Sequence, residues 1–359
     1  MQLGYFAMPA HPPERDLRLG FDWDLEVMRW LDELGFQEAW VGEHHNVPWE
    51  PLSAPDLLLA QAFRETENIR LGPGGFILPF HHPVSLANRL SWLDHISGGR
   101  LNFGVATGSV PADWSAFNVD GRSGVTRRMS KESLEIILKV WNEPPPWRYE
   151  GEFWTVELPE EVWGIFRPHI RPVQRPHPPI GMAGISPGSD TLRQCGERGF
   201  IPMSLNLAPR FLSTHWQAVE EGAALADRTA SRQDWRIVRE VVVAETDAQA
   251  KKLALEGGLG RMTREYNLPF LKNLGALDIM KDSPEMSDAD ITVDYLAEHS
   301  WIVGSPDTVA EKLEALHAAV GGFGVVMVLG FDYLDQAGAW RTSLELLARE
   351  VGPRIARLG

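Results

Sequence analysis

The chain has 359 residues, of which 44% are hydrophobic and 23% charged, a composition typical of a globular protein with a closed hydrophobic core. Its formal net charge of −15 argues against nucleic-acid binding and against binding to anionic membranes, because both need a positive field. The single cysteine, Cys195, excludes an intrachain disulfide and a cage of cysteines around a metal ion.

The beginning of the sequence does not look like a targeting segment. Residues 1–6 read as the start of a strand and lack the basic stretch and long apolar core of a signal peptide. No uninterrupted apolar run approaches the length of a membrane span. A reducing compartment fits the single cysteine, so we expect a cytoplasmic protein.

Up to Trp141 the chain alternates between strand-like and helix-like segments. Apolar residues recur at helical spacing from Trp23 to Leu34 and stop at Gly35, a normal end signal for a helix. Short links join the segments, and this rhythm predicts a parallel sheet covered by helices. We expect strands at residues 3–8, 38–43, 69–78 and 101–107, and helices at 23–34, 57–64, 83–96 and 127–141.

Two stretches interrupt this rhythm in the second half. Residues 142–178 are rich in Pro, Trp and Arg and contain a hairpin-like piece at 149–154, so they read as an insertion. Residues 257–300 look irregular and suggest a second excursion, after which Ser305 and Pro306 predict a helix start. The remaining strands are expected at 179–183, 201–207, 237–244 and 324–331, and the helices at 190–196, 210–225, from 247, from 305 and at 339–358.

These segments count to eight strand–helix pairs, which predicts an α/β fold of the (β/α)8 TIM-barrel type. We expect a single domain over residues 1–359. Its insertions fall after the fourth helix, at about 142–178, and in the seventh βα region, at about 257–300.

The strand at 38–43 ends abruptly in Glu43, His44 and His45. Ligands of α/β folds sit at the carboxyl edge of the sheet, and histidine titrates near working pH, so this pair is a candidate for proton transfer. The alternative is that an imidazole only hydrogen-bonds the barrel rim, which is the stronger interpretation for His45. A metal site including His81 and His82 is less favoured, because adjacent histidines on an extended segment point to opposite sides.

The segment Gly184-Ile185-Ser186-Pro187-Gly188 matches the nucleophile elbow of serine hydrolases. The oxyanion hole of that motif uses the N–H of the residue after the serine, and Pro187 has none. The same loop suits a phosphate group, since Ser186 and Ser189 offer hydroxyls and Gly188 and Ser189 offer N–H groups. A plain helix cap is equally compatible with the spacing.

Gly72-Pro73-Gly74-Gly75 lies inside an expected strand, where glycines mark a close approach of the backbone. Either a flat ligand ring lies against this backbone, or the glycines form a barrel bulge. No Gly-x-Gly-x-x-Gly motif stands between a strand and a helix, so the chain shows no dinucleotide-binding fold of its own.

An ordered series of motifs resembles the bacterial-luciferase-like, flavin-dependent monooxygenases over nearly the whole chain. Members that oxygenate terpenes or cyclic ketones, of the limonene and diketocamphane monooxygenase type, look most similar. The motifs are Ala39-Trp40-Val41-Gly42-Glu43-His44-His45, Leu71-Gly72-Pro73-Gly74-Gly75, Leu78-Pro79, His82-Pro83, Leu93-Asp94, Gly99-Arg100, Phe103-Gly104-Val105-Ala106-Thr107-Gly108, Arg127-Arg128-Met129 with Glu132, Gly304-Ser305-Pro306 and Val309-Ala310-Glu311.

The resemblance implies a TIM barrel that binds FMN, as FMNH2, at the carboxyl ends of its strands. His44 would be the catalytic acid/base, and a non-prolyl cis peptide would fall on Gly74–Gly75. Light-emitting members carry an arginine where this chain has Thr107, which puts light emission in doubt. The cofactor-binding residues implied by the resemblance are Gly74, Gly75, Phe76, Ala106, Thr107, Ala183, Gly184, Ile185, Ser186 and Ser189.

The activity implied is that of a two-component monooxygenase, which oxygenates a small hydrophobic terpene, cyclic ketone or aldehyde through a C4a-(hydro)peroxyflavin. A separate NAD(P)H:flavin reductase would supply FMNH2, and the chain would form a homodimer. The alternatives are an F420-dependent oxidoreductase of the same superfamily, a metal-dependent TIM-barrel hydrolase, and a flavin-binding protein without turnover.

Overall fold

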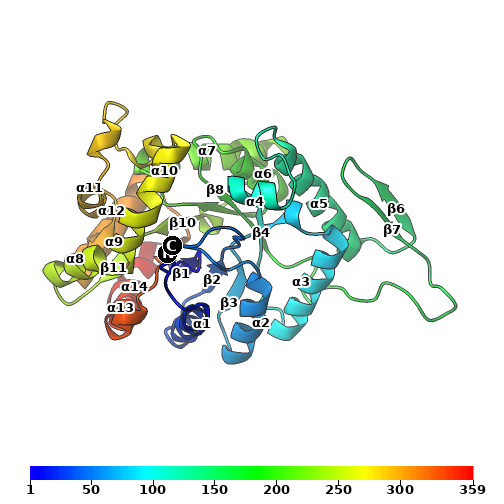
Figure 1. The fold of residues 1–359 in the computed structure, drawn as a ribbon, viewed down its shortest axis with the longest axis horizontal. Helices are drawn as coiled ribbons and strands as arrows, with labels where there is room; N and C mark the ends of the chain where they lie inside the picture. The colour runs from blue at the N-terminus through cyan, green and yellow to red at the C-terminus, as the bar shows by residue number, and fades with distance from the viewer. Residues whose placement is uncertain (359) are drawn as a thin grey trace.

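The computed structural model describes residues 1–358 and shows a parallel barrel surrounded by helices (Figure 1). The barrel strands are β1 (Gln2–Ala7), β2 (Glu38–Val41), β3 (Arg70–Pro73), β4 (Phe76–Ile77), β5 (Phe103–Ala106), β8 (Ile180–Gly184), β9 (Ile201–Ser204), β10 (Arg236–Arg239) and β13 (Val325–Gly330). Their order is β3-β2-β1-β13-β10-β9-β8-β5-β4, with parallel pairings throughout. A parallel bridge between Leu71 and Leu101 nearly closes the sheet. The predicted TIM barrel is confirmed.

The barrel strands are apolar because helices cover them outside and side chains fill them inside. Every residue of β2 and β13 is buried, as expected for parallel strands that meet no water on either face. The helices are α1 (Leu17–Glu33), α2 (Pro55–Glu65), α3 (Pro83–Ser97), α4 (Pro111–Ala116), α5 (Val125–Asn142), α6 (Asp190–Arg198), α7 (Pro209–Leu225), α8 (Asp247–Glu256), α9 (Gly258–Met262), α10 (Leu268–Leu274), α11 (Val293–His299), α12 (Pro306–Ala319), α13 (Ala337–Leu346) and α14 (Gly352–Ile355).

The predicted start of α12 is confirmed in its details. The Ser305 side chain accepts a hydrogen bond from the N–H of Thr308, and Pro306 opens the helix. The N-terminus and the C-terminus lie side by side (Figure 1), and the Met1 amino group donates a hydrogen bond of 3.2 Å to the carbonyl oxygen of Ile355. One continuous core runs through the described residues, which supports the single-domain interpretation; that interpretation stays a prediction.

The expected third strand is broken into β3 and β4 at Gly74 and Gly75. A Cβ on Gly75 would lie 2.7 Å from the carbonyl carbon of Gly104, and one on Gly74 would lie 3.1 Å from the Phe6 ring. The expected cis peptide between these glycines is wrong for this structure. Among residues 1–358, the cis bonds are Pro145–Pro146 and Arg175–Pro176. The close backbone approach at Gly75 is reached with trans peptides because neither glycine carries a side chain.

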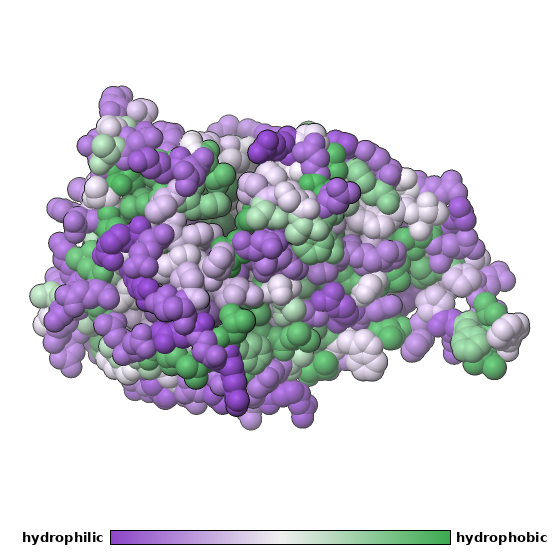
Figure 2. Space-filling model, viewed as in Figure 1, coloured by the Kyte–Doolittle hydropathy of each residue, from purple (hydrophilic) through white to green (hydrophobic). Residues whose placement is uncertain are grey.

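Residues 142–178 form an arm that projects from the barrel (Figure 1). Its hairpin pairs β6 (Trp147–Glu150) with β7 (Thr155–Leu158) in antiparallel register, as the sequence indicated. The Glu132 carboxylate on α5 accepts hydrogen bonds from the N–H groups of residues 152–154 and fixes the hairpin turn. The far end exposes apolar side chains, with Trp163 83% and Ile165 71% exposed (Figure 2).

Residues 257–300 are more regular than the sequence indicated. They contain α9, a π-helical turn at Thr263–Asn267, α10 and α11. Pro269 lies in the first turn of α10, directly after the π-helical turn, where a missing N–H costs little. Much of the stretch is therefore helical, although its sequence shows no regular pattern.

The expected strand at 237–244 is also divided. Its second part, β11 (Val241–Val243), leaves the barrel and pairs in parallel with β12 (Ile302–Gly304). The strand β12 is not predictable from the sequence, because three residues are too few for a periodic pattern.

No helix within residues 1–358 combines the length and the apolar character needed to cross a membrane.

Candidate active site

A cavity of about 210 Å³ opens at the carboxyl ends of the barrel strands, where TIM barrels bind their ligands. The surface is hollowed beside α10, and hydrophobic side chains surround the hollow (Figure 2). Most of the lining is apolar, with Phe6, Met8, Leu329 and Phe331 among its members. We refer to it as the mouth cavity. It suits a small hydrophobic molecule or a flat aromatic ring.

His44 reaches the mouth cavity from the loop after β2, as the sequence predicted. Its backbone N–H donates to the carbonyl oxygen of Leu52 at 2.9 Å, which fixes the loop. The side chain is 14% exposed, and Nδ1 is buried without a hydrogen-bond partner among the described residues. Burial lowers the pKa of His44 from its usual 6.5, so the neutral imidazole predominates near neutral pH.

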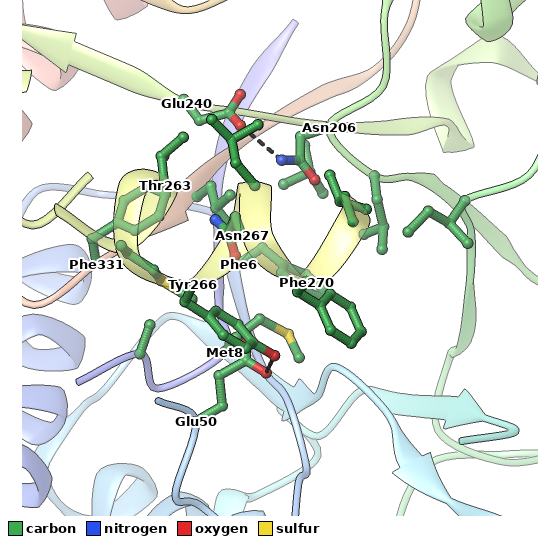
Figure 3. Close-up of a pocket in the computed structure, with 18 of the residues that line it drawn as sticks. Phe6, Met8, Glu50, Asn206, Glu240, Thr263, Tyr266, Asn267, Phe270 and Phe331 are labelled. Atoms are coloured by element: carbon green, nitrogen blue, oxygen red, sulfur yellow. Dashed lines mark hydrogen bonds between the residues drawn. The ribbon is translucent and has the colours of Figure 1, made fainter. Parts of the chain in front are cut away.

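Glu50 and Tyr266 lie together at one end of the cavity (Figure 3), and His44 contacts Glu50. The Tyr266 hydroxyl donates to Glu50 Oε2 at 3.2 Å, and His44 Nε2 lies 3.3 Å from the same oxygen. Burial raises the pKa of Glu50 to about 8. The contact between these residues is not predictable from the sequence, because Glu50 lies in a polar loop without a motif and Tyr266 is 216 positions further along the chain.

A second polar pair lies at the opposite end of the cavity, where Glu240 accepts a hydrogen bond of 2.7 Å from the side-chain amide of Asn206 (Figure 3). Burial raises the pKa of the Glu240 carboxyl, which favours its neutral form. Glu240 follows the barrel strand β10, and Asn206 follows β9; neither carries a sequence motif that marks it as a site residue. Only the register of the barrel shows that they face inwards.

Glu43 has a structural role beneath His44. Its Oε1 lies 2.8 Å from Nε2 of both His45 and His81, and its Oε2 accepts from the N–H of Ile77 at 2.7 Å. Burial alone would raise the pKa of Glu43, but the contacts with His45 and His81 outweigh it and lower the pKa. The structure therefore favours the rim-bonding interpretation for His45. Within residues 1–358, no group of three His, Cys, Asp or Glu side chains could hold a metal ion.

A second cavity of about 150 Å³ lies between α5 and the loop that joins β8 to α6. Thr107, Ser186 and Ser189 line it, as does the segment 187–191. We refer to it as the basic cavity, because Arg127 and Lys131 on α5 also line it. Cations, hydroxyls and a helix N-terminus together form a donor set for an anion such as a phosphate group.

The loop of the basic cavity is held from behind by His215. Its Nε2 contacts the carbonyl oxygen of Ser186 at 2.9 Å, and its Nδ1 contacts Ser204 Oγ at 2.9 Å. Ser189 caps α6, its hydroxyl accepting from the N–H of Leu192 at 3.4 Å. The helix-cap interpretation therefore accounts for Ser189, while Ser186 is positioned for another partner.

Consecutive residues line the two cavities: Ile185 lines the mouth cavity, and Ser186 lines the basic cavity. The structure thus brings together five of the residues expected at the site: His44, Thr107, Ile185, Ser186 and Ser189. The rest line neither cavity and stay predictions as cofactor contacts: Gly74, Gly75, Phe76, Ala106, Ala183 and Gly184. Phe76 is fully buried beside His81, and Gly74 and Gly75 lie close to Phe6 and Gly104 in the barrel wall.

Comparison with known proteins agrees with this geometry. The family model described as luciferase-like monooxygenase matches residues 1–321. The 3,6-diketocamphane 1,6-monooxygenase of Pseudomonas putida is 32% identical over 372 residues, which cover 99% of this chain and 98% of the relative. Limonene 1,2-monooxygenase of Rhodococcus erythropolis is 29% identical over 358 residues, covering 99% of this chain and 87% of that enzyme.

A solved structure shows the same architecture. It is the oxygenating constituent of 3,6-diketocamphane monooxygenase from the CAM plasmid of Pseudomonas putida, a type II Baeyer-Villiger monooxygenase in complex with FMN. It superposes with a TM-score of 0.93 at 33% identity and covers 98% of both chains. The family match over most of the sequence and the near-complete alignment lead to one conclusion: the chain belongs to the luciferase-like monooxygenase family.

Proposed function

We propose that this protein is the oxygenase component of a two-component FMN-dependent monooxygenase. It takes FMN already reduced by a separate NAD(P)H:flavin reductase and uses O2 to oxygenate a small hydrophobic substrate such as a terpene, a cyclic ketone or an aldehyde. The observation that carries this proposal is that consecutive residues, Ile185 and Ser186, line an apolar cavity and a cavity with cationic and hydroxyl donors.

The residues of the two cavities fit FMN. Arg127, Lys131 and the Ser186 hydroxyl would hold the phosphate, and the aromatic and aliphatic lining of the mouth cavity would hold the ring system. His44 lines the mouth cavity with a side chain that is 14% exposed, so its imidazole is accessible to a ligand bound there. Reduced FMN, when bound, supplies the electrons that activate O2.

The chain's own residues supply the surroundings of the reaction. The apolar lining keeps water away from the reacting atoms, which protects a reactive oxygen species from hydrolysis. His44 would hold or move a proton in the mouth cavity, and Glu240 with Asn206 forms a polar end of that cavity. The Pseudomonas putida relative is the oxygenating constituent of its enzyme, which supports a separate reductase. A homodimer and a cytoplasmic location remain proposals.

The test is to supply chemically reduced FMN to the purified protein and measure O2 uptake and oxygenated product with terpenes, cyclic ketones and aldehydes. We expect product with at least one of these classes. His44→Ala should reduce product formation on the order of 10²-fold while reduced FMN still binds. If His44→Ala oxygenates the substrate at the wild-type rate, His44 is not the catalytic acid/base. Turnover with F420 in place of FMN would favour the alternative oxidoreductase.

A further inference from the structure

Glu50 places a buried carboxyl group against the histidine of the proposed active site. Its side chain is 8% exposed, its Oε2 accepts a hydrogen bond from the Tyr266 hydroxyl at 3.2 Å, and the same oxygen lies 3.3 Å from His44 Nε2. All three side chains line the mouth cavity, and Glu50 and Tyr266 lie together at one end of it (Figure 3). The carboxyl group and the imidazole are therefore in contact at the surface that a ligand would meet.

The surroundings of the pair favour its uncharged form. Burial raises the pKa of Glu50 to about 8, and the hydrogen bond from Tyr266 offsets only part of this effect. For His44, burial lowers the pKa from 6.5; the charges of Asp113 and Glu43 oppose this change, and that of His45 adds to it. Between these two pKa values, Glu50 is protonated and His44 is not. The pair then holds one proton.

An ion pair at the same place would be costly. It would put an imidazolium and a carboxylate into an apolar cavity, and the loss of hydration exceeds the mutual attraction unless further hydrogen bonds satisfy both groups. Tyr266 satisfies one carboxylate oxygen, whereas Nδ1 of His44 has no partner among the residues described. A neutral carboxylic acid facing a neutral imidazole avoids this cost.

We propose that His44 and Glu50 act as one acid, which holds a single proton between Nε2 and Oε2 and delivers it to an oxyanion on the ligand in the mouth cavity. This inference rests on the proposed function and adds a second residue to it. In the transfer, an O–H bond forms on the ligand, the N–H or O–H bond of the pair breaks, and no electrons leave the pair. The negative charge then stays on Glu50, where the Tyr266 hydroxyl stabilises it. Tyr266 is a positioning residue in this account.

The decisive variant is Glu50→Gln, which keeps the size of the side chain and removes the acidic proton. With chemically reduced FMN, the wild-type oxygenation rate should fall as the pH rises through about 8, where Glu50 loses its proton. The variant should be slower at neutral pH on the order of 10²-fold, because His44 alone carries no proton there. Its rate should recover only as the pH falls below 6.5, where His44 itself becomes protonated. Glu298→Gln, an exposed glutamate on α11, is the matched control and should keep the wild-type profile.

A readout without cofactor uses the protein labelled with ¹⁵N-histidine and follows the His44 resonances through a pH titration. The His44 signals are assigned by their loss in His44→Ala. In the wild type, the Nε2 signal should show a step near pH 8 that reports the neighbouring Glu50, and Glu50→Gln should lack this step. A wild-type titration without the step, or a variant that keeps it, would overturn the proposal. So would a Glu50→Gln enzyme with the wild-type pH profile.

Tyr266→Phe gives a second, independent variant should Glu50→Gln not fold. The Tyr266 hydroxyl lowers the pKa of Glu50, so its removal should move the falling limb of the pH profile to higher pH. An unmoved limb contradicts the proposal. The outcome for the proposed function is separate: a wild-type protein that binds no reduced FMN would end the oxygenase assignment, while the histidine titration would still decide whether the pair shares a proton.

Discussion

Neighbouring residues after β2 have different tasks because successive side chains of an extended segment point in opposite directions. His44 turns into the mouth cavity, whereas His45 turns to Glu43 at 2.8 Å and shares that carboxylate with His81. Glu43 thereby ties the loop after β2 to the segment around β4, through the N–H of Ile77. One histidine is left available to a ligand, and the other holds the wall behind it.

His11 gives a prediction on stability at the same scale. Its ring lies 3.2 Å from Asp24 and 3.0 Å from Asp332, and all three side chains are buried. Burial alone would lower the pKa of His11, but the contacts with the two carboxylates raise it to about 9. A folded pKa above the unfolded value of 6.5 stabilises the fold fully below pH 6.5, and this stabilisation is lost as the pH rises through about 9.

We therefore expect the free energy of unfolding of the wild type to fall between pH 6.5 and 9, by an amount on the order of 3 kcal/mol. His11→Gln should start from a lower free energy and should vary less over that range. Urea unfolding at a series of pH values measures both curves. Parallel curves for the two proteins would show that His11 carries no raised pKa.

At the scale of elements, the barrel and the hairpin of the arm were predictable, whereas the division of individual strands was not. The buried strands and capped helices gave periodic signals, as at Ser305 and Pro306. Local patterns could not reveal that the expected strand at 237–244 divides into β10 in the barrel and β11 outside it, or that β11 pairs with β12. The active-site partners of His44 were missed for the same reason: Glu50 and Tyr266 meet only through the folded chain. For His44, residue type and position at the end of a strand were sufficient to predict that it faces the mouth cavity.

The helix α5 and the β8–α6 loop lead to a prediction on the phosphate group. Arg127→Ala combined with Lys131→Ala should weaken the binding of FMN by at least about tenfold, because each charged hydrogen bond contributes about 1.5–3 kcal/mol. The affinity for riboflavin, which lacks the phosphate, should not change. Flavin fluorescence titration measures both ligands. Arg128→Ala is the matched control, since the neighbouring Arg128 pairs with Glu152 on the arm at 2.9 Å. If the double variant loses affinity for FMN and for riboflavin equally, the phosphate group does not bind at Arg127 and Lys131.

At the scale of the whole molecule, the net charge of −15 makes the protein acidic. Large apolar side chains that are nevertheless exposed to solvent can mark a contact surface. Leu57 on α2 is 68% exposed, and Trp92 and Ile96 on the neighbouring α3 are 57% and 38% exposed. Large exposed apolar side chains on adjacent helices are typical of a protein–protein interface. They support the proposed homodimer.

Trp92→Glu tests that proposal. A charge in the middle of an apolar interface should separate the two copies, so light scattering after size exclusion should show a dimer for the wild type and a monomer for the variant. Circular dichroism should show that the variant keeps its fold. A wild-type protein of the mass of one chain, or a variant that stays dimeric, contradicts this assignment of the surface.

The most direct test of the account is an anaerobic titration of the wild-type protein with reduced FMN, with oxidised FMN, riboflavin and F420 as competitors. The apolar mouth cavity and the basic cavity, which consecutive residues line, predict saturable binding of reduced FMN at one site per chain, weaker binding of riboflavin, and no displacement by F420. A protein that leaves reduced FMN free in solution, or that exchanges it readily for F420, would contradict the assignment.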